Sequence, residues 1–169
     1  MVEQQEASGD AVMTRIGQAV MLLHGGDREE ARNRFGILWS ELGADGDALH
    51  RCTLAHYMAD TQDDPGDELA WDLRALTAAE GLSGERSAEH RDSLAVQAFY
   101  PSLHLNLAAD YLKLQRPDAA RIHLRQARDA ADTLEDGGHG GYEGYGGYSG
   151  YDAGVRAAIE RLELRMRGM

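Results

Sequence analysis

Cysteine is almost absent from this chain. Cys52 is the only one among 169 residues, so no internal disulfide can form, and a lone cysteine is most often a small core residue. Proline is also rare, since only Pro65, Pro101 and Pro117 occur. Alanine, leucine, glutamate and arginine dominate outside one glycine-rich segment, and this mixture favours helix.

Long apolar runs are missing as well. No stretch approaches the ~20 apolar residues that a membrane-spanning helix needs. The first ten residues, MVEQQEASGD, are polar and acidic and lack the apolar core of a signal peptide. We therefore expect a cytoplasmic protein that does not contact membranes. Sixteen arginines against one lysine, with abundant alanine, glycine and aspartate, indicate a GC-rich bacterial genome.

Positive charge is scarce. The chain contains 17 Lys and Arg residues and 29 Asp and Glu residues, which gives a formal net charge of −12. Residues 1–84 hold most of this excess, with a net charge of −10. Nucleic acid is disfavoured as a partner, because phosphate binding needs clustered Lys and Arg. The acidic charge either keeps the protein soluble or attracts a basic partner.

Apolar residues recur at helical spacing through most of the chain. The pattern predicts pairs of helices with short connections, which pack as antiparallel hairpins. The predicted pairs span 11–26 with 27–42, 47–62 with 63–82, and 100–116 with 117–134. Another helix is expected at roughly 87–99, within a longer connection. A final amphipathic helix is expected near 153–167, with Val155, Ile159, Leu162 and Met166 on one face.

Local signals mark where several of these helices begin. Asp27 is a predicted N-cap, and Glu30 lies three residues later, where a capping-box partner belongs. Pro65 stands where a first-turn proline is tolerated. These signals support the hairpin boundaries independently of the apolar pattern.

A repeated frame runs through the helical pairs. In the third pair the frame Y-x3-Q-x4-A-x3-L-x2-A is formed by Tyr111, Gln115, Ala120, Leu124 and Ala127. It is similar to the tetratricopeptide repeat, a helix-turn-helix unit of about 34 residues. The main departure is the bulky tryptophan position of the repeat, which is occupied here by Arg15, His50 and His104.

The segments HYMADTQDDPGDELAWDLRAL and FYPSLHLNLAADY also resemble a group of small actinobacterial tetratricopeptide proteins. The resemblance implies an all-α fold, a right-handed superhelical stack of about three tetratricopeptide-like helix pairs with a C-terminal capping helix. It implies no particular activity. We expect a flexible N-terminus at residues 1–9 and a helical domain at 10–136. A Gly/Tyr-rich loop at 137–152 and a capping helix at 153–169 should follow.

In such a stack the first helix of each pair lines a concave groove that binds peptides. The predicted groove is mostly apolar, and Arg51 and Asn106 are its polar features. The groove residues are Ile16, Val20, Arg51, Ala55, Met58, Ser102, Leu105, Asn106 and Ala109. An exposed apolar groove usually marks a binding site, although the capping helix or the 81–99 connection could instead cover it. The family's carboxylate clamp lacks its Lys, Asn and Arg set, so chaperone-tail binding is not expected.

Acidic residues cluster between the two helices of the second pair. This acidic elbow consists of Asp60, Asp63 and Asp64. It either grips a basic peptide or is a solvated turn that places carboxylates near a helix N-terminus. Trp71 lies close by and is expected to contact the neighbouring repeat.

The segment GGHGGYEGYGGYSGYDAG, residues 137–154, places four tyrosines three residues apart among glycines. Glycine loses the most backbone freedom on ordering, so the segment is expected to tether the capping helix. Alternatively, the tyrosines dock on an apolar surface. These tyrosines are Tyr142, Tyr145, Tyr148 and Tyr151.

No arrangement of residues indicates catalysis or metal binding. The sequence has no GxSxG, no HExxH, no phosphate-binding glycine loop and no cysteine cluster. His56 and Asp60 are four residues apart on one predicted helix, but a zinc site needs three or four converging ligands. We predict no enzyme activity, no metal and no cofactor.

These observations favour a protein or peptide interaction module, a non-catalytic adaptor or regulator that uses the concave groove. The acidic charge makes a basic partner the natural one. The alternative is a protein that binds or senses a small ligand in the groove between its helices.

Overall fold

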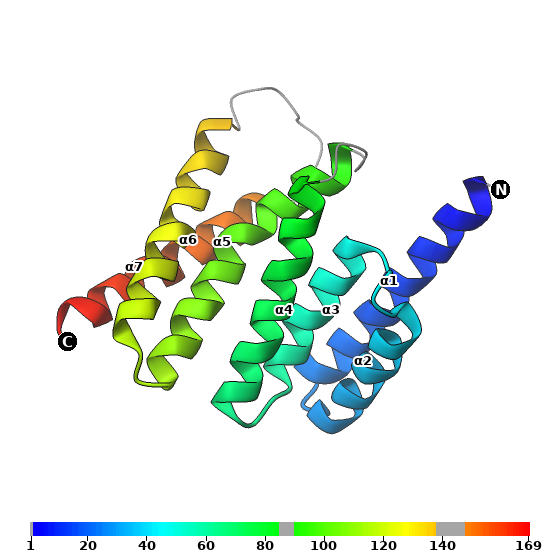
Figure 1. Cartoon of the computed structure of the whole chain (residues 1–169), viewed down its shortest axis with the longest axis horizontal. Helices are drawn as coiled ribbons and strands as arrows, with labels where there is room; N and C mark the ends of the chain where they lie inside the picture. The colour runs from blue at the N-terminus through cyan, green and yellow to red at the C-terminus, as the bar shows by residue number, and fades with distance from the viewer. Residues whose placement is uncertain (1, 85–89, 138–147) are drawn as a thin grey trace. The chain divides into compact units, whose positions relative to one another are not determined.

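The computed structural model describes residues 2–84, 90–137 and 148–169. These residues form seven α-helices and no strand, which confirms the all-α class for the described part of the chain (Figure 1). The chain divides into two compact units, unit 1 (Met1–Gly84) and unit 2 (Glu85–Met169). The helices are α1 (Val2–His24), α2 (Arg28–Leu42), α3 (Ala48–Asp60), α4 (Pro65–Gly84), α5 (His90–Lys113), α6 (Pro117–Gly137) and α7 (Tyr148–Arg167).

Unit 1 is built from two helical hairpins, α1 with α2 and α3 with α4 (Figure 1). Helix α3 contacts both α1 and α2, so the second hairpin packs on the first. Large and small apolar side chains interlock in the shared core, which removes their surface from water. The core residues are Ile16, Ala19, Ala31, Phe35, Leu38, Leu54 and Met58.

Polar side chains satisfy the helix starts of unit 1. Asp27 Oδ1 accepts a hydrogen bond from the Glu30 amide at 3.3 Å, which confirms the predicted N-cap of α2. Asp47 caps α3 in the same way, accepting from the His50 amide at 3.0 Å. Helix α4 begins at Pro65, as predicted.

Unit 2 consists of the hairpin of α5 and α6 with α7 packed against both of these helices. The hairpin turn places Gln115 in the left-handed region, with φ 59°, two residues before Pro117 starts α6. Ile159 and Met166 of α7 are buried in the core of unit 2, and Val155 and Leu162 pack against it. The predicted apolar face of the last helix is therefore confirmed.

Three predicted boundaries differ from the structure. Helix α1 begins at Val2, so residues 2–9 are helical and not flexible coil; glutamate, glutamine and alanine are good helix formers. Helix α5 runs from His90 to Lys113 through Pro101, so the predicted 87–99 helix and the first helix of the third pair are one helix. Helix α7 begins at Tyr148, within the predicted loop. Tyr142 and Tyr145 lie outside the described residues.

The helices differ in how their apolar and charged side chains are distributed. No helix among the described residues combines the length and the apolar character that a membrane crossing requires. Helices α2 and α6 have one apolar face toward their own unit and a charged face toward water, whereas α3 is largely buried.

Candidate functional site

The predicted groove residues of unit 1 do not form an open surface. Ile16 and Met58 are 2% and 5% exposed and belong to the core of unit 1. Ala55 is fully buried, and Val20 packs against the same core. The prediction is wrong for Ile16, Ala55 and Met58, because a bound peptide could not reach these buried side chains.

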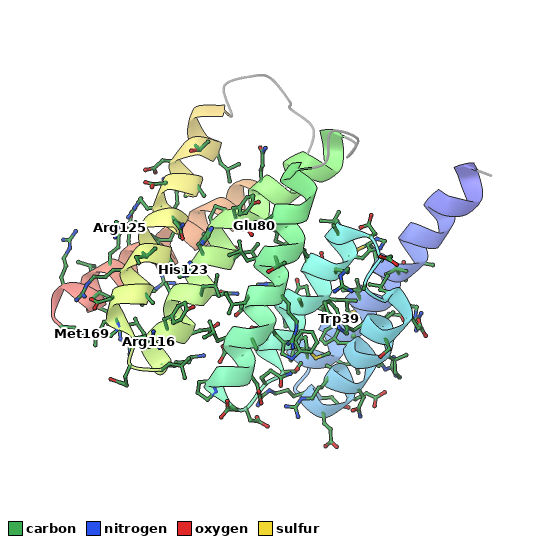
Figure 2. All side chains as sticks on the ribbon, in the orientation of Figure 1. Trp39, Glu80, Arg116, His123, Arg125 and Met169 are labelled. Atoms are coloured by element: carbon green, nitrogen blue, oxygen red, sulfur yellow. The ribbon has the colours of Figure 1, made fainter. Side chains whose placement is uncertain are left out.

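Arg51 has a structural role in this unit. Its guanidinium lies over the Trp39 ring, 4.1 Å from the centroid, and donates a hydrogen bond to the Gly43 carbonyl oxygen. Trp39 meets Trp71 edge to face at 5.1 Å, which confirms the expected contact of Trp71 with the neighbouring pair. Arg74 lies over Trp71 at 4.4 Å. Arg51 thus ties α3 to α2 through Trp39, which Figure 2 labels, and Trp71 ties α4 to α2 through the same ring.

The predicted groove residues of unit 2 are also largely covered. Leu105 packs against the core formed by α5, α6 and α7. Ser102 is buried, and Asn106 and Ala109 are half-buried. These positions do not form an exposed apolar groove within unit 2.

The acidic elbow forms an exposed turn tied to α2. The Asp63 carboxylate pairs with Arg28 at 2.8 Å and with Arg32 at 3.4 Å, although its side chain remains 75% exposed. Asp64 Oδ1 accepts from the backbone amides of two residues in the first turn of α4. Asp60 is exposed at the end of α3. This geometry supports the structural interpretation of the elbow.

Sequence reasoning missed that α2 caps the C-terminus of α3. Arg32 Nε donates to the Thr61 carbonyl oxygen at 3.0 Å, and Arg28 donates to the Gln62 carbonyl oxygen. The last carbonyls of a helix have no partner within the helix, and cations there also interact favourably with the helix dipole. No local motif signals this contact, because it depends on how α2 and α3 are placed.

A histidine pair in unit 2 was also missed. His104 Nδ1 and His123 Nδ1 lie 3.1 Å apart, and Tyr111 stacks on His123 with 5.4 Å between ring centroids. Burial and the neighbouring His123 lower the pKa of His104 to about 4, and burial lowers the pKa of His123. Both rings are therefore neutral at neutral pH, and one can donate its Nδ1 proton to the other.

The structure offers no clear chemistry elsewhere in the part of the chain that it describes. Cys52 is buried, and burial raises the pKa of its thiol to about 12, so the thiol is inert at neutral pH. The described residues contain no group of three or more His, Cys, Asp or Glu residues able to hold a metal ion.

The most distinctive free surface of unit 1 is the α1–α2 face, formed by Gln18, Met21, Arg34 and Ile37. Two depressions of ≈ 210 and ≈ 560 Å³ lie here, and both are lined by Gln18 and Arg34. Met21 is 75% exposed and Ile37 is 54% exposed. Large apolar side chains thus stand beside shallow depressions on one continuous helical surface.

Ion pairs border the α1–α2 face. Arg15 pairs with Glu41 at 2.5 Å between α1 and α2, and Arg34 pairs with Glu30 at 2.8 Å along α2. The charges at the border are therefore balanced. The exposed apolar side chains of Met21 and Ile37 are the distinguishing feature of this face. An apolar centre with a polar rim is the usual anatomy of a protein interface.

No protein-family model, curated protein or solved structure matches this chain. The resemblance to tetratricopeptide repeats therefore depends on the repeated residue frame of the sequence.

Proposed function

We propose that this protein is a non-catalytic interaction module that binds a protein or peptide partner on its α1–α2 face. The observation that carries the proposal is the exposure of Met21 and Ile37 beside the two adjoining depressions. Exposed apolar side chains gathered around shallow depressions favour association. The depressions are open to solvent, a form that suits a partner's side chains better than a small ligand, whose sites are usually concave and enclosed.

A tetratricopeptide-like architecture is part of this proposal. In both units a third helix packs on both members of a helical hairpin: α3 on α1 and α2, and α7 on α5 and α6. This is the packing expected where each repeat buries its apolar face against the next. The α1–α2 hairpin is the first in the chain, and one side of it carries the exposed residues just described.

The partner we propose presents apolar side chains and carries positive charge. Apolar groups would cover Met21 and Ile37, whereas the net charge of −10 on residues 1–84 would attract a basic partner over a distance. The partner's association rate should then fall between ~0.05 and ~0.5 M salt, because the Debye length drops below ~10 Å.

The test compares affinity capture by three forms of the full chain from a lysate of the source cells. These are the wild type, the Met21→Ser/Ile37→Ser variant and an Ile122→Ser control, since Ile122 is also half exposed, at 50%, but lies on α6. A partner that binds the α1–α2 face should be retained by the wild type and the control. Its affinity for the double variant, measured calorimetrically with the purified partner, should be weaker by about tenfold or more. Equal capture by all three forms would contradict the proposal.

A further inference from the structure

Positive charge gathers at one end of unit 2, in an otherwise acidic protein. Residues 113–128 and 160–167 carry eight Lys and Arg residues against three Asp and Glu residues, a local charge of +5. The two stretches lie side by side, because Arg128 on α6 donates two hydrogen bonds to Glu163 on α7, at 3.2 and 2.7 Å. They therefore form a single basic surface.

A pocket of ≈ 440 Å³ lies between α6 and α7 on this surface. Its floor is apolar, since Leu124 and Met166 are 5% and 6% exposed, and Arg121, Arg125 and Arg167 also line it. Figure 2 labels Arg125 on α6, on the same side of unit 2 as the end of the chain beyond α7. The volume falls within the range of about 300–1,000 Å³ typical of binding pockets.

Two of these arginines provide uncompensated charge. Arg121 pairs with Asp118 at 3.0 Å, and the one carboxylate that lines the pocket, Glu163, is held by a neighbouring arginine. In the described part of the chain, Arg125 and Arg167 form no ion pair. Planar guanidinium groups bind carboxylates through paired hydrogen bonds, so the pocket suits a carboxylate-rich segment.

We propose that this pocket binds the α3–α4 turn of a second copy of the chain. Residues 60–68 carry five acidic residues and no basic residue, more acid than any other nine-residue stretch. The turn is accessible, since the Asp63 side chain is 75% exposed and Asp64 and Asp67 are exposed as well. The charge of −10 on residues 1–84 adds a long-range attraction to the basic pocket.

The two surfaces in this contact are different, so the interface is heterologous. When two copies bind, one keeps a free turn and the other keeps a free pocket, so such contacts produce open chains unless a rotation closes them into a ring. Association should increase with protein concentration. It should weaken with salt, because the contact depends on exposed charges.

Sedimentation velocity of the full chain tests this proposal. The wild type should show a sedimentation coefficient that rises with concentration at ~20 mM NaCl and falls back at ~500 mM. Arg125→Glu/Arg167→Glu should weaken self-association by about tenfold or more. Arg161→Glu/Arg165→Glu changes the net charge equally, on exposed α7 residues that do not line the pocket, and should retain it.

A mixing experiment identifies the two halves of the contact. Asp63→Asn/Asp67→Arg lowers the acidity of the turn and preserves the helix-capping Asp64. This variant and Arg125→Glu/Arg167→Glu should each remain monomeric alone, but together they should form a 1:1 dimer that grows no further. Circular dichroism confirms that both variants are folded. A monomeric wild type at low salt, or a mixture that remains monomeric, would overturn the proposal. Loss of association in the Arg161→Glu/Arg165→Glu control would also overturn it, because net charge alone would then be responsible.

Discussion

His104 and His123 meet edge to edge, with their Nδ1 atoms 3.1 Å apart. The ring centroids are 5.4 Å apart and the planes differ by 23°. The centroid separation exceeds the Nδ1–Nδ1 distance by about two ring radii, so both nitrogens lie near the line between the centroids. The nearly coplanar rings therefore share an N–H···N hydrogen bond and are not stacked face to face.

This pair should make unit 2 less stable in mild acid. The pKa of His104 is about 4 and that of His123 is also lowered, whereas an unfolded histidine has a pKa of about 6.5. The unfolded state therefore binds protons first as the pH falls. The stabilisation is complete above about pH 6.5 and is lost progressively toward about pH 4.

Thermal unfolding followed by circular dichroism between pH 7 and pH 5 checks this dependence. The wild type should lose stability across the range, and His104→Leu/His123→Leu should lose less. His24→Gln, at the exposed end of α1, is the control and should behave as the wild type does. Nitrogen NMR at pH 7 should show one ring protonated at Nδ1 and the other at Nε2. Two rings of the same tautomer would rule out the shared hydrogen bond.

The cap that Arg32 of α2 provides for α3 should contribute more to the stability of unit 1 than a surface ion pair within α2. Arg32→Ala removes the donors to the Thr61 carbonyl and should cost about 1–2 kcal/mol. Arg34→Ala removes only an exposed pair with Glu30, worth a few tenths of a kcal/mol. Urea unfolding followed by tryptophan fluorescence measures unit 1 alone, because the chain's only tryptophans are in this unit. Equal losses in the two variants would show that the cap contributes little.

Arg51→Ala should destabilise unit 1 rather than act on partner binding. The substitution uncovers Trp39 and removes the hydrogen bond to the Gly43 carbonyl oxygen, at a cost of about 1–2 kcal/mol. The tryptophan emission should shift to the red as Trp39 gains contact with water. Arg74→Ala, which uncovers the other tryptophan, is the comparison and should cost less, because only the stacking contact is lost. An unchanged urea midpoint for Arg51→Ala would show that Arg51 does not stabilise unit 1, and the prediction that it binds a partner would then stand.

The buried face of helix α7 should be essential to the stability of unit 2. Ile159 is fully buried, whereas Leu164 on the same helix is 64% exposed. Ile159→Ala should cost about 2–4 kcal/mol through lost burial and the cavity left behind, and Leu164→Ala should remain within about 0.5 kcal/mol of the wild type. Hydrogen exchange of the α7 amides should accelerate only in the first variant. Unchanged exchange would show that α7 does not depend on this contact.

Local sequence signals predicted the helices well. The Asp27 cap and the Pro65 start depend on neighbours within a few residues, and the apolar face of α7 follows from helical periodicity. The division between a helix at 87–99 and a helix starting at 100 was wrong, because α5 continues through Pro101, although a proline inside a helix usually ends or kinks it. The start of α1 at Val2 was missed because a polar segment without periodicity indicates a loop.

The surfaces were harder to predict than the helices. Periodicity identifies an apolar face but does not say whether that face meets a neighbouring helix or water, so Ile16 and Met58 were assigned to a groove although they form the core. The contacts of Arg32 with Thr61 and of His104 with His123 join residues on different helices, so they depend on how those helices are placed.

Photocrosslinking in the source cells shows whether the α1–α2 face contacts a partner. A photoreactive amino acid replaces Ile37 on the α1–α2 face or, as a control, Ile122 on α6, two sites of similar exposure, 54% and 50%. We predict a crosslink to a discrete partner, different from the chain itself, from position 37 but not from position 122. Met21→Ser should weaken this crosslink. No adduct at position 37, or the same adducts from both positions, would show that the α1–α2 face binds no specific partner.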